Sequence, residues 1–204
     1  PEWDSDVMTI GAFMVDRIES NESTTAKTFR EASRKASDLL FYQDGIAGTV
    51  TVRQSREPIS ALSLAINGKP EASDSTMDMQ TQVLCGHLGS LLRPGGKTGM
   101  VIGMGSGVTL SGMLAHESFQ RVDMIEINPA VAQAVRAHFG HLNDYALDDP
   151  RTNLVLADGR NHIALTDRKY DQIASVPSNP WMAGIANLFT REFFEMCRDR
   201  LTDE

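Results

Sequence analysis

The sequence has few cysteines and no long apolar run. Its two cysteines, Cys85 and Cys197, form no C-x-x-C pair, so neither a disulfide framework nor a cysteine-rich zinc site is indicated. His138 and His141 could share one helix face, but no carboxylate or cysteine is arranged with them, and we expect no metal. No apolar stretch reaches membrane-spanning length and no signal peptide opens the chain. We expect a soluble piece cut from a longer protein.

Basic residues are also scarce, with 19 Lys and Arg against 27 Asp and Glu and a formal net charge of −8. A protein that binds along a nucleic acid needs a broad positive surface to neutralise phosphates. Nucleic-acid binding is therefore not expected. The negative surface could attract small cations such as amines, although charge that keeps the protein in solution explains the same composition.

The residues that are present divide the chain into three parts. Residues 1–37 form a polar segment to which we assign no chemistry. Residues 38–76 alternate with a period of two, which predicts a small antiparallel β-sheet with Asp44-Gly45 as its hairpin signal. Residues 77–204 alternate apolar strands with helices, which predicts a doubly wound, Rossmann-like α/β sheet. We expect helices over 77–92 and 187–201, and further helices that begin at Val108 and Pro129.

The main functional motif is a glycine-rich turn, Gly103-Met104-Gly105-Ser106-Gly107, between an apolar strand and a helix. Such a turn lets a ligand approach the backbone. Glu126 ends the next strand, close to the offset of about 20 residues at which an acid accepts hydrogen bonds from ribose hydroxyls. The alternative interpretation is that Glu126 is an ordinary surface glutamate at a strand end. The G-x-G-x-G spacing differs from the dinucleotide fingerprint, because Val108 stands where that fingerprint has its third glycine.

A second acidic position follows the third predicted strand, at Asp158-Gly159. The Asp158 carboxylate could accept a hydrogen bond from an adenine amino group, and Gly159 could leave room for the ring. A simple turn explains the same dipeptide. Together with G-x-G-x-G, this arrangement resembles the class I S-adenosylmethionine-methyltransferase-like fold, here preceded by the small antiparallel sheet.

The order of the parts from about residue 38 to the end resembles the spermidine synthase family. It is most similar to a divergent branch that has PSNPW in place of the catalytic D-x-x-D-P motif. The segments that carry the resemblance are QVLCGHL, VIGMGSG, MIEIN, ADGR, YDQIASVPSNPW and LFTREFFEMCRDRL.

The resemblance implies transfer of an aminopropyl group from decarboxylated S-adenosylmethionine to an amine such as putrescine, without a metal. It also implies a homodimer and a cytoplasmic location, or a soluble domain of a larger membrane-attached protein. The cofactor-binding residues that we expect are Gln43, Gln82, Gly103, Gly105, Ser106, Gly107, Glu126, Asp158, Gly159 and Ser175.

The substrate half departs from the family. Val176 occupies the place of the catalytic aspartate, and Asn179 that of a second aspartate that helps to bind the diamine. Ser106 occupies the position where the family usually has an aspartate that holds the transferable amine, and Thr81 occupies the position of a substrate-binding tyrosine. Trp181 could stack on the ligand or pack against the last helix. The substrate-binding residues that we expect are Asp78, Thr81, Asn179 and Trp181.

These departures leave three functions open. An attacking amine is mostly protonated near neutral pH, and valine cannot take its proton, so transfer would need another acid such as Asp78 or Asp44. A methyltransferase is favoured by Ser106, because an aspartate there would repel the carboxylate of intact S-adenosylmethionine. A domain that binds an adenosyl ligand without turnover is favoured by Val176.

Overall fold

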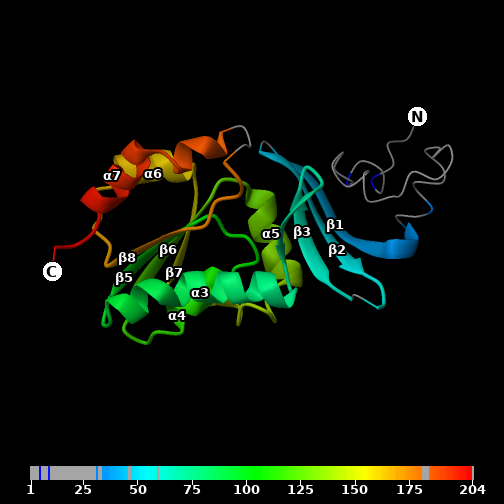
Figure 1. Cartoon of the computed structure of the whole chain (residues 1–204), viewed down its shortest axis with the longest axis horizontal. Helices are drawn as coiled ribbons and strands as arrows, with labels where there is room; N and C mark the ends of the chain where they lie inside the picture. The colour runs from blue at the N-terminus through cyan, green and yellow to red at the C-terminus, as the bar shows by residue number, and fades with distance from the viewer. Residues whose placement is uncertain are drawn as a thin grey trace. The chain divides into compact units, whose positions relative to one another are not determined.

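The computed structural model describes residues 5, 9, 31, 34–45, 47–58, 60–180 and 184–203. These residues fall into two compact units, Pro1–Asp78 and Met79–Glu204. Figure 1 shows an antiparallel sheet in the first unit and a parallel sheet flanked by helices in the second. Most of the polar segment expected over residues 1–37 lies outside the described residues.

The first unit is an antiparallel sheet in the order β1-β2-β3-β4. Its strands are β1 (Ser37–Gly45), β2 (Gly48–Ser55), β3 (Leu62–Ile66) and β4 (Lys69–Ser73). Alternate side chains of β2 and β3 form the buried face, because successive residues of a strand point to opposite sides. The buried apolar residues on these strands are Val50, Val52, Leu62 and Leu64.

The turns of this sheet differ from the expected ones. Asp44-Gly45 lies within β1, and Gly45 pairs with Gly48 across the following turn. β3 ends at Ile66, because Asn67 and Gly68 adopt left-handed backbone conformations and turn the chain into β4. β4 was not predicted, since it contains Pro70 between polar residues. Proline is tolerated there because β4 is an edge strand.

The second unit is a parallel sheet in the order β7-β6-β5-β8, which confirms the predicted α/β fold class. Its strands are β5 (Thr98–Ile102), β6 (Arg121–Glu126), β7 (Thr152–Leu156) and β8 (Gln172–Ser175). Its α-helices are α3 (Thr76–Leu92, which begins in the first unit), α4 (Val108–Leu114), α5 (Pro129–His138), α6 (Gly159–Leu165) and α7 (Arg191–Asp199). Short 3-10 helices are η2 (Ala146–Asp148) and η3 (Ile185–Leu188).

Helices cover both faces of the parallel sheet. Figure 1 shows α6 and α7 on one side and α3 and α4 on the other. On the first side, Met100 and Ile125 of the sheet pack in one core cluster with Ile163 of α6 and Phe193 of α7. The last helix is shorter than the expected 187–201, because the Thr190 hydroxyl accepts a hydrogen bond from Phe193 N and caps α7.

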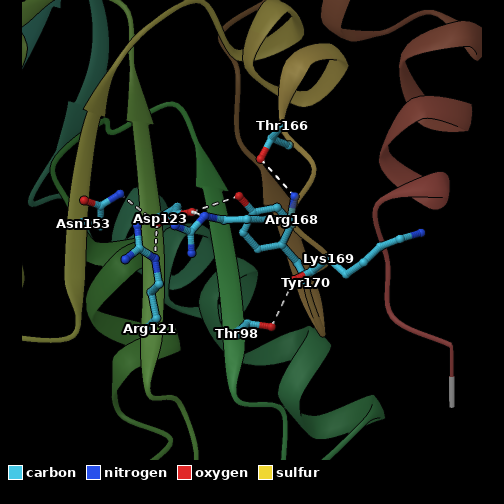
Figure 2. Close-up of polar contacts among 8 residues, drawn as sticks. All are labelled: Thr98, Arg121, Asp123, Asn153, Thr166, Arg168, Lys169 and Tyr170. Carbon is cyan, nitrogen blue, oxygen red and sulfur yellow. Dashed lines mark hydrogen bonds and ion pairs between the residues drawn. The ribbon is translucent and has the colours of Figure 1, made fainter.

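A buried polar cluster lies toward the amino ends of these strands (Figure 2). The side chain of Asp123 is almost fully buried and accepts hydrogen bonds from Tyr170 OH (2.9 Å), Arg121 Nε (2.8 Å) and Asn153 Nδ2 (2.9 Å). Burial, followed by the hydrogen bond to Asp123, raises the pKa of Tyr170 to about 12. Since Asp123 is the third residue of β6, this cluster belongs to the sheet edge opposite the carboxyl ends.

Candidate functional site

The candidate site lies at the carboxyl ends of the parallel strands. β5 is flanked by β6 and β8, so the chain leaves β5 at the point where the strand order reverses. Open α/β sheets bind ligands outside the carboxyl ends of their strands at such a point. The glycine turn follows β5, while Glu126 ends β6 and Ser175 ends β8. The fold therefore brings these sequence-predicted residues to one edge.

The turn after β5 requires its glycines. Gly103, Gly105 and Gly107 have φ values of +88°, +55° and +83°, which side-chain-bearing residues rarely adopt. A Cβ on Gly103 would lie 2.9 Å from the carbonyl oxygen of Val176. The turn therefore has no side chain at these three positions, and two of the glycines, Gly103 and Gly105, are partly accessible.

Glu126 is tied to this turn by its carboxylate. Oε2 accepts a hydrogen bond from Met104 N (3.1 Å), and Oε1 accepts one from Asn128 N (2.8 Å). Burial raises the pKa of Glu126, although backbone N–H groups of residues 128, 104 and 127 oppose the shift. Each carboxylate oxygen can accept more than one hydrogen bond. Glu126 can thus hold the turn and still accept hydrogen bonds from a ribose.

Ser106 and Gln82 pair beneath the turn. Ser106 is fully buried, and its hydroxyl donates to Gln82 Oε1 at 2.5 Å. Gln82 comes from α3 and is also buried, while its backbone carbonyl accepts a hydrogen bond from Thr109. The Ser106 hydroxyl is therefore engaged by Gln82, and only the backbone of Ser106 belongs to the turn at the carboxyl edge.

Asp158 and Gly159 follow the neighbouring strand β7. Ala157 N donates to Glu126 O, which keeps the two strand ends together. Asp158 Oδ1 accepts a hydrogen bond from Asn161 N (2.8 Å) and caps α6, so one carboxylate oxygen is engaged. A Cβ on Gly159 would collide with Ile102 Cγ2. Close packing of α6 on β5 explains this glycine.

The end of β8 and the residue after it contribute a buried hydroxyl and an apolar side chain. Ser175 Oγ is buried and has no hydrogen-bond partner among the described residues. Val176 continues the strand ladder, because its N–H donates to Ile102 O (2.9 Å). Asn179 is half-buried two residues beyond Pro177. Trp181 lies outside the described residues.

The remaining predicted residues lie on α3 or in the first unit. Thr81 is exposed on α3. Asp78 accepts hydrogen bonds from Ser73 N and Ser73 Oγ, and Asp44 from Thr49 Oγ1 and Tyr42 OH, so both proposed substitutes for the missing acid have partners within the first unit. Gln43 is a half-buried residue of β1.

Two asparagines at this edge were not predicted. Asn128 caps α5 by accepting a hydrogen bond from Ala130 N (3.0 Å), and its position directly before Pro129 is a usable helix-start signal. Asn143 Nδ2 donates to Ser106 O at 2.7 Å. Asn143 lies 37 residues along the chain from Ser106, and no local sequence pattern links them.

The residues that the structure describes contain neither a metal-binding cluster nor a membrane-spanning helix. Within them, no group of three or more His, Cys, Asp or Glu side chains is arranged to hold a metal ion. The helices placed there are all too short or too polar to cross a membrane. Cys85 and Cys197 are free thiols, and burial raises the pKa of Cys197 to about 11.

Comparisons with known proteins concern both sequence and structure. A family profile described as the spermine/spermidine synthase domain matches residues 78–204, more than half of the chain. A polyamine aminopropyltransferase of Serratia proteamaculans is 30% identical over 160 residues, which cover 78% of this chain and 50% of the relative. A polyamine aminopropyltransferase of Thermotoga petrophila is 30% identical over 118 residues, which cover 58% of this chain and 40% of the relative. The chain thus spans half or less of the length of these relatives.

Solved structures of similar fold are also found. A spermidine synthase in complex with the transition-state analogue AdoDATO matches with a TM-score of 0.73 at 22% identity, over 80% of this chain and 55% of that one. The spermidine synthase of Thermotoga maritima matches with a TM-score of 0.71 at 23% identity, over 80% and 54%. At these identities the likeness establishes the shared fold.

Proposed function

Because the chain belongs to the spermine/spermidine synthase family, we propose that its second unit binds an adenosyl ligand at the carboxyl edge of the parallel sheet. The ligand is decarboxylated S-adenosylmethionine or a closely related compound, and the reaction is transfer of an aminopropyl group to a small amine. We place this reaction in the cytoplasm, either as a separate protein or as a domain of a larger membrane-attached one, and in a homodimer.

One observation carries the proposal. The turn after β5 has three left-handed glycines, and the buried carboxylate of Glu126 is bonded to its backbone at Met104 N. Ser175 Oγ, at the end of the adjacent strand β8, is buried without a partner among the described residues. A glycine turn next to a carboxylate and a hydroxyl without a partner suits a nucleoside, because the ribose hydroxyls and the adenine amino group can form hydrogen bonds with the carboxylate and with the hydroxyl.

The residues of this edge have separate roles in the proposal. Glu126 accepts hydrogen bonds from the ribose hydroxyls, and Asp158 accepts one from the adenine amino group through the oxygen that does not cap α6. Ser175 supplies a hydroxyl that can donate or accept. Gln82 supports the turn through its hydrogen bond with Ser106. When bound, decarboxylated S-adenosylmethionine supplies the activated aminopropyl group.

Val176 raises a second candidate, a domain that binds the ligand without turnover. Its backbone N–H donates to Ile102 O, which fixes the position of Val176 at the end of the strand. The valine side chain can neither accept a proton nor pair with a cation. A positioned general base contributes a factor of roughly 100 to 10,000 in rate. Transfer is therefore expected to be slow by that factor unless another part of the whole protein supplies the base.

Calorimetry tests binding in either case. Decarboxylated S-adenosylmethionine, S-adenosylmethionine and methylthioadenosine should be titrated separately into the full chain. We expect methylthioadenosine and the decarboxylated compound to bind, and their saturation at about 100 times Kd to stabilise the fold by about 2.7 kcal/mol. Tighter binding of the intact compound would favour a methyltransferase. No binding of any of the three would refute the adenosyl site.

The variant Val176→Asp separates transfer from binding alone. The new carboxylate can accept a proton from the amine, so putrescine-dependent release of methylthioadenosine should rise by about 100-fold or more over the wild type. Val176→Asn has a similar size and no charge, and it serves as the control. Equal rates for all three proteins, with ligand binding intact, would favour the domain without turnover.

A further inference from the structure

Asn143 is buried next to the glycine turn, although it belongs to the segment between α5 and η2. Its side chain is 1% exposed. Nδ2 donates to Ser106 O at 2.7 Å, and Oδ1 accepts from Ala146 N at 3.3 Å. The same amide therefore joins the turn to a distant segment of the second unit and uses both of its polar atoms.

The contact also restricts Gly107. A Cβ on Gly107, which has φ +83°, would lie 2.6 Å from Asn143 Nδ2. The asparagine thus fills the space that a side chain at residue 107 would need. Ser106 O points to Asn143 while Ser106 Oγ bonds to Gln82, so the middle of the turn is held from two sides.

The two residues after Asn143 have unusual backbone conformations. Asp144 and Tyr145 have φ values of +51° and +54°. Aspartate enters this left-handed region more readily than most residues other than glycine, whereas a bulky residue such as tyrosine is an outlier there. Asp144 Oδ2 accepts a hydrogen bond from Ser111 of α4 (3.3 Å), and Tyr145 N donates to Gly140 O (2.9 Å). Such strain persists only where surrounding contacts impose it, and it is concentrated near functional sites.

We propose that Asn143 is a positioning residue for ligand binding, which holds the glycine turn in its left-handed conformation before the ligand arrives. The proposal rests on the adenosyl site proposed above. Its physical basis is that a turn ordered in advance does not lose conformational freedom on binding. If the Asn143 amide is removed, the turn samples other conformations, and only a fraction of the molecules can bind.

Two substitutions at this position test the proposal on the full chain. Asn143→Asp keeps the size and the acceptor for Ala146 N but replaces the donor with a carboxylate oxygen that faces the Ser106 carbonyl. Asn143→Ala removes both groups. Asn153→Ala is the control, since Asn153 is a partly buried asparagine of the second unit whose side chain bonds to Asp123 toward the opposite edge.

Two measurements are needed. Hydrogen exchange of the ligand-free protein, followed by mass spectrometry, should show faster exchange of residues 103–108 in both Asn143 variants and unchanged exchange there in Asn153→Ala. The Kd for methylthioadenosine should rise about 10-fold in the Asn143 variants. Asn153→Ala should lower the melting temperature without changing Kd.

The outcomes are distinct. Wild-type exchange over residues 103–108 in Asn143→Asp would overturn the proposal, and so would an equal rise of Kd in Asn153→Ala. If the wild type binds no adenosyl compound, the proposed function fails, but the exchange experiment still decides whether Asn143 orders the turn. If Asn143→Ala does not fold, Asn143→Asp supplies both measurements.

Discussion

At the scale of single residues, the buried carboxylate of Asp123 depends on its donors. Tyr170 OH is one of them, at 2.9 Å from Oδ2. Hydrogen bonds to charged groups contribute about 1.5–3 kcal/mol, and loss of the donor leaves a buried charge less satisfied. We expect Tyr170→Phe to lower the free energy of unfolding by about 2 kcal/mol, measured by urea denaturation near neutral pH.

The matched control is Tyr145→Phe, which also removes one phenolic hydroxyl but from a side chain that is mostly exposed. This variant should unfold within about 0.5 kcal/mol of the wild type. Because the Asp123 cluster lies away from the carboxyl edge, Tyr170→Phe should not change the Kd for methylthioadenosine. Equal stability of Tyr170→Phe and the wild type would mean that Arg121, Asn153 and Arg168 satisfy the carboxylate without Tyr170.

The sequence predicted the residues of the site that follow directly from strand ends. The positions of Glu126 and Asp158 at the carboxyl edge were predicted because an acid at the end of an apolar strand has a defined place in a parallel sheet. The burial of Ser106 and the role of Asn143 were not found, since both depend on contacts between segments distant in the sequence. The packing of Gly159 against Ile102 was not predicted either, because this contact is visible only in the structure.

At the scale of elements, the packing of α3 on α4 requires a glycine. A Cβ on Gly86 would lie 2.5 Å from Thr109 O and 2.9 Å from Gly112 Cα, and both are backbone atoms. Gly→Ala in an exposed helix would stabilise by up to about 1 kcal/mol, because alanine is the better helix former. Here the clash outweighs the gain in helix propensity. We therefore expect Gly86→Ala to lower the free energy of unfolding, measured by urea denaturation, by about 1–3 kcal/mol.

Gly89→Ala on the same helix is the control. Its new Cβ would meet the side chain of Gln172, which can move at the cost of its hydrogen bonds to Ser90 and Gly86 O. We expect a smaller loss than for Gly86→Ala, because backbone atoms cannot move aside as a side chain can. A Gly86→Ala variant that is as stable as the wild type would show that α3 shifts freely over α4.

Helices and central strands were predicted well, because their apolar periodicity is strong over many residues. α3 begins one residue before its expected start, and α4 and α5 begin at the expected residues. Short elements were missed. β4 has too few apolar residues to show a period, and the expected helix over 187–201 is divided because Thr190 caps α7 after the separate η3.

At the scale of the whole molecule, the second unit is closed by contacts between its first strand and its last residues. Asp171 Oδ2 accepts hydrogen bonds from Lys97 N (2.7 Å) and Thr98 N (2.9 Å), and Oδ1 accepts one from Thr202 Oγ1 (2.8 Å). Burial raises the pKa of Asp171, but these hydrogen bonds outweigh it and lower the pKa from 3.8 to about 2. The carboxylate therefore stabilises the unit in its charged form.

This shift predicts how stability depends on pH. A carboxylate with a lowered folded-state pKa contributes stability that is present above the unfolded value, here 3.8, and lost as pH falls through about 2. The contribution is at most about 2 kcal/mol, at 1.36 kcal/mol per pKa unit. Asp171→Asn should be less stable than the wild type near neutral pH, and the difference should shrink between about pH 4 and pH 2 in urea denaturation. Asp167→Asn, which removes an exposed carboxylate, is the control, and its stability should depend on pH as that of the wild type does. A difference in stability between Asp171→Asn and the wild type that stays constant with pH would show that packing, and not the charge of Asp171, closes the unit.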